Sequence, residues 1–81
     1  MKAIVHVTLK PEVLDPQGVA IQRATASLGL TAVTRVRQGK VFELELDETD
    51  PERARASVGE LCEKLLANPV IETYRILSLE S

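Results

Sequence analysis

Residues 32–47, AVTRVRQGKVFELELD, form the stretch that decides the predicted fold. The run 32–37 is rich in β-branched residues, and the run 41–47 alternates apolar with acidic side chains. Both patterns are typical of β-strands. The three residues between them, Gln38-Gly39-Lys40, include the glycine that tight turns favour. We therefore expect a β-hairpin, with its two strands paired within this chain.

Each side of this hairpin carries a helix that begins with the same dipeptide. Asp15-Pro16 and Asp50-Pro51 place an N-cap side chain directly before a proline at the first helical position. Gly29 supplies a left-handed cap at the end of the first helix, and Asn68-Pro69 ends the second. The expected apolar stripes are Ala20, Ile21, Ala24 and Leu28 in the first helix, and Ala54, Val58, Leu61, Cys62 and Leu65 in the second.

Two further strands complete the pattern at the ends of the chain. Residues 2–9 alternate, with Val5, Val7 and Leu9 on one face, and a last strand is expected over about 71–79. The order β-α-β-β-α-β predicts an α+β fold, a ferredoxin-like two-layer sandwich. It would have a four-stranded antiparallel sheet with two helices on one face, as a single domain over 1–81.

Size and composition favour association with other chains. A domain of 81 residues buries only about 60–65% of its unfolded surface, and Cys62 is the single cysteine, so no disulfide forms within the chain. A net charge of −2 offers no basic face for nucleic acid. No apolar run approaches the ~20 residues that span a membrane, and no export signal is recognisable, so we expect a cytoplasmic protein.

The predicted sheet has a second face that neither helix covers. This face mixes apolar with charged side chains, so it is neither a closed core nor a solvated surface, and it suggests pairing with another copy of the chain. The last strand is apolar on both sides, which favours the same conclusion. The residues expected at such a homo-oligomer interface are Ile4, His6, Val41, Glu43 and Tyr74.

Groups able to perform catalysis are scarce in this sequence. His6 lies between valines in a strand, where a structural or interfacial role is favoured, and Cys62 lies on an apolar helical stripe. One cysteine and one histidine cannot close a zinc site within a chain. We therefore expect no catalytic residue, no metal site and no cofactor-binding site in this chain.

Three segments resemble the PurS family, the small subunit of phosphoribosylformylglycinamidine (FGAM) synthase. Residues 10–18, KPEVLDPQG, are similar to the family's K-P-G-V-L-D-P-Q-G loop. Residues 36–44, VRQGKVFEL, are similar to its V-R-x-G-K segment, and residues 62–72, CEKLLANPVIE, to its C-x-K-L-L-A-N-P-V-I-E segment. Two positions depart from the family pattern, because Glu12 stands where glycine is usual and Val41 where an aromatic residue is common.

The resemblance implies a non-catalytic subunit of an ATP-dependent glutamine amidotransferase in de novo purine biosynthesis. Such a chain would form a homodimer or homotetramer and bridge a large synthetase subunit and a glutaminase subunit for ammonia transfer. The assembled enzyme would use ATP and magnesium, whereas this chain would bind no cofactor, nucleic acid or membrane. The expected contacts with the other subunits are Asp15, Gln17, Arg37, Lys40, Asn68 and Pro69.

Two other functions are compatible with the residues. A stand-alone ferredoxin-like regulatory module would bind a small metabolite and would be stabilised by it without any partner. A small enzyme would use His6 and would lose its activity, but not its fold, in a His6→Ala variant.

Overall fold

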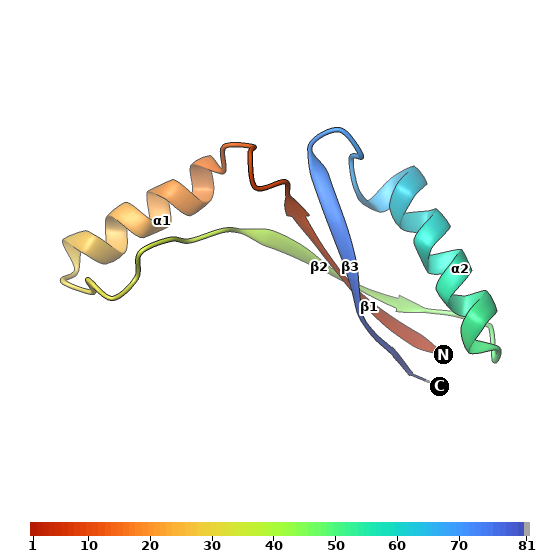
Figure 1. Cartoon of the computed structure of the whole chain (residues 1–81). Helices are drawn as coiled ribbons and strands as arrows, with labels where there is room; N and C mark the ends of the chain where they lie inside the picture. Colours follow the sequence, from red (N-terminus) through yellow and green to blue (C-terminus); the bar gives the residue numbers. More distant parts are fainter. Residues whose placement is uncertain (81) are drawn as a thin grey trace.

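The computed structural model describes residues 1–80 and contains one antiparallel sheet. Strands β1 (Lys2–Leu9), β2 (Gly39–Glu45) and β3 (Glu72–Glu80) lie in the order β2-β1-β3 (Figure 1). β1 is the central strand and pairs antiparallel with both neighbours. The first and last strands predicted from the alternation of the sequence are confirmed.

The predicted four-stranded sheet is wrong, because the described sheet has three strands. Residues 33–38 belong to no strand, and β2 begins only at Gly39. The predicted hairpin is therefore absent. Instead of turning at Gln38-Gly39-Lys40, the chain runs on from this segment into β2 (Figure 1). The β-branched composition of 32–37 predicted an extended conformation but gave no information about where its partner lies.

Helix α2 (Pro51–Leu61) begins at the N-cap Asp50, as predicted, and packs on one face of the sheet (Figure 1). It continues as a π-helical turn, η1 (Cys62–Leu66), in which the Ala67 N–H donates to the Cys62 carbonyl at 2.9 Å. The core forms between this helix and the middle of the sheet. Its buried members are Ala3, Val5 and Val7 of β1, with Val58, Cys62 and Ala67.

The π turn changes which leucine faces the sheet. Regular α-helical spacing from Val58 and Cys62 predicted Leu65 in the apolar stripe, but its side chain is 74% exposed. Leu66 packs against the core instead. A wider turn shifts the residues that follow around the helix axis, which explains why the predicted stripe is wrong at its last position.

Helix α1 (Pro16–Ser27) projects away from the sheet and forms an arm together with residues 28–38 (Figure 1). Its predicted ends are confirmed, since Asp15 is the N-cap and Gly29 has φ +80°. Its predicted place on the sheet is wrong. Ile21 and Leu28 of the apolar stripe are exposed, and no extensive contact joins α1 to any described strand. The radius of gyration is 16.0 Å, against about 12 Å for a compact chain of this length.

A β-bulge decides which side chains of β3 face α2. Ile4 pairs with Ser78, but the next residue, Val5, pairs with Ile76, so Leu77 is the extra residue. An inserted residue reverses the alternation beyond it. Tyr74 and Ile76 therefore pack against the core together with Leu79, whereas simple alternation placed Tyr74 and Leu79 on opposite faces.

The buried and exposed sides of the second helix provide a direct test of this packing. Replacing Val58, which is fully buried, with alanine should lower the free energy of unfolding by about 2 kcal/mol, because it leaves a cavity in the core. Leu65→Ala, in the same helical segment, should change it by less than about 0.5 kcal/mol. Urea unfolding followed by circular dichroism measures both. Equal losses would contradict the assignment of Leu65 to the surface.

Candidate functional site

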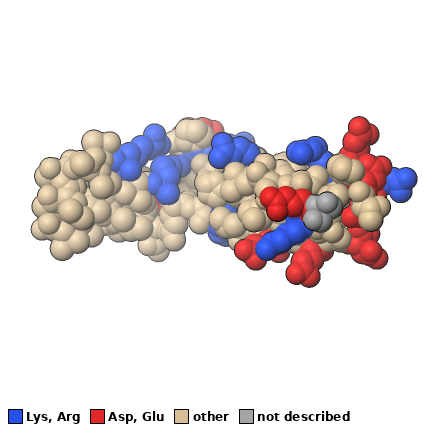
Figure 2. All heavy atoms as spheres, turned by 90° about the horizontal axis from the view of Figure 1, so that it is seen from below, with Lys and Arg blue, Asp and Glu red and all other residues tan. Residues whose placement is uncertain are grey.

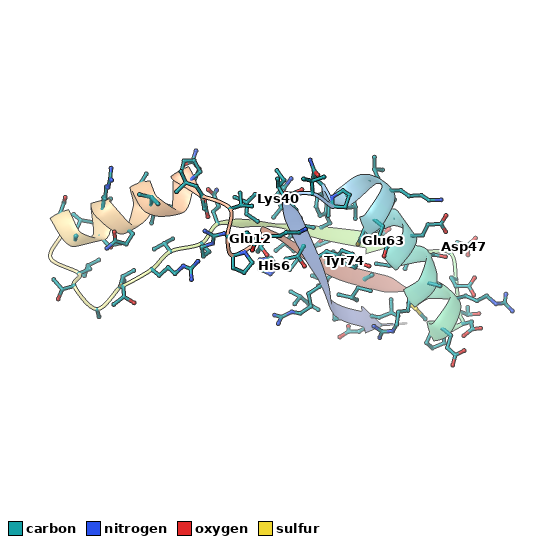
Figure 3. All side chains as sticks on the ribbon, turned by 45° about the horizontal axis from the view of Figure 1, so that its top comes forward. His6, Glu12, Lys40, Asp47, Glu63 and Tyr74 are labelled. Carbon is teal, nitrogen blue, oxygen red and sulfur yellow. The ribbon has the colours of Figure 1, made fainter. Side chains whose placement is uncertain are left out.

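The three sequence segments that resemble the PurS family meet at one end of the sheet, where the arm begins. We call this region the arm base: residues 9–18, 36–40 and 68–72. The Lys10 N–H donates to the Ile71 carbonyl at 2.8 Å, and Lys40 Nζ lies 3.5 Å from a carboxylate oxygen of Glu72. Figure 3 places Lys40 and Glu12 where the arm joins the sheet. Segments that are far apart in the sequence thus form one surface.

Asp15 joins the two sides of the arm. One carboxylate oxygen accepts from the Gly18 N–H at 3.0 Å, which caps α1, and the other accepts from the Gln38 N–H at 2.7 Å. The side chain is buried, at 4% exposed. The bonds from the Gln38 and Gly18 N–H groups lower the pKa of Asp15 below its ordinary value, and the positive charge of Arg37 adds to this effect.

Arg37 folds back onto its own chain. Its Nη2 atom lies 3.0 Å from the Lys10 carbonyl, 3.2 Å from the Val13 carbonyl and 3.4 Å from the Leu9 carbonyl. Hydrogen bonds from a charged donor to carbonyl oxygens are stronger than neutral ones. The guanidinium group therefore holds the loop between β1 and α1 against the segment that leads into β2.

Glu72 connects the third segment to the first two. One of its oxygens accepts from the Asn68 N–H at 2.7 Å, and the other lies near Lys40. The Asn68 side chain accepts from the Val70 N–H at 3.0 Å and so forms a local turn around Pro69. Sequence reasoning missed Glu72, although its position at the end of the third segment and the start of a strand was visible.

Two glycines permit close approaches at the arm base. A Cβ atom on Gly18 would overlap the Val36 carbonyl oxygen. One on Gly39 would lie within 3 Å of atoms of Thr8, Val7 and His6. The sequence predicted Gly39 as a turn residue, and this is wrong. It is needed because β2 passes tightly beside β1.

The six residues predicted to contact partner subunits all lie in this region, but they differ in accessibility. Asp15 is buried and Arg37 is half-buried, and both are used in bonds within the chain. The other four side chains are exposed: Gln17, Lys40, Asn68 and Pro69. The contact role of all six stays a prediction, and the exposed four are the ones available to a partner without rearrangement.

The predicted homo-oligomer residues separate into two groups. Ile4 pairs with Glu43 and His6 pairs with Val41, so these four side chains share the sheet face opposite α2. Tyr74 lies on the helix-covered face, where its hydroxyl donates to Glu63 of η1 at 3.3 Å (Figure 3). Val41 is 60% exposed and lies on the open face of the edge strand β2.

Charge is distributed unevenly along the molecule. Residues 1–40 contain six lysines and arginines and two acidic residues, whereas residues 41–81 contain four and ten. Between residues 16 and 34, Arg23 is the single charged residue. Figure 2 shows an arm tip without charge, basic side chains in the middle and acidic side chains gathered toward the opposite end.

Residues 1–80 contain no group of three or more histidine, cysteine or acidic side chains placed to hold a metal ion. None of the described helices is long and apolar enough to cross a membrane. Cys62 is buried in the core, and burial raises the pKa of its thiol, which disfavours the reactive thiolate.

Comparison with known families finds a match over nearly the whole described chain. The family model "PurS: Phosphoribosylformylglycinamidine (FGAM) synthase" matches residues 2–80. The chain belongs to the PurS family. It is 51% identical to the PurS subunit of Mycobacterium leprae over 75 residues, which are 93% of this chain and 91% of that one. It is 50% identical to the Bacillus subtilis subunit over 74 residues, 91% and 87% of the two chains.

Solved PurS structures share the observed fold. The Bacillus subtilis PurS structure matches with a TM-score of 0.84 and 48% identity, covering 98% of each chain. Thermotoga maritima PurS matches with a TM-score of 0.88 and 35% identity, covering 96% of this chain and 90% of that one. A chain of the Thermotoga maritima PurLQS structure matches with a TM-score of 0.84 and 32% identity, covering 98% and 99%.

The chain is therefore a PurS subunit of FGAM synthase, an enzyme of purine biosynthesis. FGAM synthase is a ligase complex, and PurS is its non-catalytic subunit.

Substitution of Asp15 tests how much its hydrogen bonds at the arm base contribute to the stability of the fold. Asp15→Asn leaves one accepting oxygen and puts an NH2 donor against the other of the Gly18 and Gln38 N–H groups, so the variant should melt several degrees lower at pH 7. Because folding lowers the pKa of Asp15, its contribution is present above the unfolded value of 3.8 and is lost as the pH falls below it. The difference in melting temperature between wild type and variant should therefore shrink below pH 3.8. A constant difference from pH 7 to pH 3 would contradict the role of the carboxylate.

Proposed function

We propose that this chain bridges the synthetase and glutaminase subunits of FGAM synthase and holds them so that ammonia passes between them. The fold supports this role through its shape. The molecule extends over 49 Å but is only 13 Å thick in its narrowest direction. A long, thin chain with chemically different ends can contact two larger proteins at once.

The observation that carries the proposal is the rigid arm base. Its charged and glycine residues are used to fix the direction of the arm: Asp15, Gly18, Arg37, Gly39 and Glu72. These hydrogen bonds maintain the shape of the arm base. The charged groups that form them are occupied within the chain and are therefore not available to act on a substrate. The exposed side chains around them, Gln17, Lys40, Asn68 and Pro69, are held in one surface that a partner subunit can recognise.

Three further properties belong to the same proposal. The chain acts as a homodimer or homotetramer in the assembled enzyme, because the arm and the open sheet face leave apolar side chains uncovered. ATP and magnesium are used by the complex and not by this subunit. The working location is the cytoplasm, together with the other subunits.

Reconstitution with the synthetase and glutaminase subunits from the same source tests the bridging role. Without this chain, FGAM synthesis from glutamine should fall by at least tenfold, whereas synthesis from added ammonium should change little. An affinity tag on this chain should recover both partners in the presence of glutamine and nucleotide. Recovery of a glutaminase–synthetase complex with full glutamine-dependent activity in its absence would refute the proposal.

Paired variants locate the contact surface within that assay. Lys40→Glu reverses an exposed charge at the arm base and should weaken recovery of a partner subunit. Arg55→Glu makes the same change on an exposed residue of α2 and serves as the control. If both variants recover the partners equally well and retain the melting temperature, the arm base is not the contact surface.

A further inference from the structure

The open face of the sheet, opposite α2, carries a group of polar side chains that take no part in the arm base. His6 and Thr8 of β1 lie on this face, because the residues that alternate with them pack against the core. Thr73 and Arg75 of β3 lie on the same face for the same reason. The register places Arg75 directly opposite His6 and Thr73 directly opposite Thr8. Two neighbouring strands thus bring four polar side chains together.

These four side chains line an open hollow in the surface of the sheet, with a volume of about 390 Å³. Sites for small molecules commonly measure about 300–1,000 Å³. Gly39 of β2 pairs with Thr8, and a Cβ atom on it would lie 2.9 Å from His6 Nε2. The missing side chain therefore allows the imidazole ring to lean over β2, and the hollow over β1 and β3 stays open.

The positive charge in the hollow is not neutralised within the described chain. Among residues 1–80, Arg75 forms no ion pair, whereas Lys2 of β1 pairs with Glu43 and Lys40 of β2 pairs with Glu72. Glu43 lies on the open face too, but Lys2 Nζ is 3.7 Å from its carboxylate. Glu45 lies opposite Lys2, at the far end of the strands. The guanidinium group of Arg75 is thus available to an anion from outside the chain.

We propose that this hollow binds a phosphate monoester. A guanidinium group offers parallel N–H donors that match two phosphate oxygens. The hydroxyl groups of Thr8 and Thr73 and an imidazole N–H of His6 supply further donors around the same point. The inference goes beyond the bridging role in the proposed function and does not depend on it.

The arrangement of the donors favours a phosphate ester over other anions. A carboxylate has two oxygens and is satisfied by Arg75 alone, whereas the three terminal oxygens of a phosphate monoester can accept from both strands at once. The hollow is also larger than a phosphate group requires. It has room for an attached sugar, so the ligand class is a ribose phosphate or the 5′-phosphate end of a ribonucleotide.

Nuclear magnetic resonance titration of the full-length, nitrogen-15-labelled protein tests the site. Ribose 5-phosphate, added at constant ionic strength, should shift the amide signals of the four residues, and the shifts should reach saturation. Ribose without the phosphate should leave these signals unchanged. Inorganic phosphate should shift the same signals but bind more weakly than the ester, because it lacks the contacts of the sugar.

Three variants assign the binding to this hollow. Arg75→Gln keeps a long polar side chain but removes the charge, and it should weaken binding of ribose 5-phosphate about tenfold. Thr73→Val keeps the shape of the side chain without the hydroxyl group, and it should weaken binding about threefold. Arg55→Gln, at an exposed position of α2, is the matched control and should bind as the wild type does. Circular dichroism melting shows whether each variant is folded.

Each outcome decides the proposal. Shifts that grow without saturation, or that sulfate reproduces at the same concentrations, would show general screening of charge and overturn the site. Inorganic phosphate that binds as tightly as ribose 5-phosphate would overturn the assignment to an ester. A folded Arg75→Gln variant with wild-type affinity would place the ligand elsewhere and refute the proposal. Binding is measured on this chain alone, so failure of the bridging role is distinguishable.

Discussion

The shape of this molecule depends on the hydrogen bonds that the Asp15 carboxylate accepts. Its two oxygens accept from the Gly18 and Gln38 N–H groups, so one side chain starts the arm helix and fixes the segment that returns from it. Arg37 adds a second connection between the same two parts of the chain. With both in place, the arm leaves the sheet in one direction, and the residues around Gly39 remain extended.

The rest of the chain is a small core built on three strands and one helix. Its fully buried side chains are small: three residues of β1 with Ala54, Val58 and Cys62. A core of this size provides limited hydrophobic stabilisation. The apolar residues of the arm add nothing to it within one chain, because they are exposed. The described structure therefore leaves apolar surface uncovered on the arm, and large exposed apolar patches commonly mark sites of association.

A subunit of this kind contributes geometry to an enzyme rather than chemistry. Residues of the three segments that resemble the PurS family are used in this chain for backbone hydrogen bonds, close backbone packing and one ion pair. These interactions tolerate little change in length or angle, since each joins parts of the backbone that are distant in sequence. Glu12 fits without strain, because no described non-glycine residue has a positive φ.

The sequence alone determined the local elements. The strand over 2–9, both Asp-Pro helix starts, the Gly29 cap and the last strand all depend on a few neighbouring residues, whose preferences act within one turn or one pleat. Tertiary structure decided what these elements contact. The strand-like run at 32–37 pairs with none of the described strands. A π turn places Leu66 instead of Leu65 against the core, and a bulge turns Tyr74 toward the face that α2 covers. In each case a few long-range hydrogen bonds or one inserted residue decided which side chains face the core or which strands pair. The periodicity of the sequence does not predict such features.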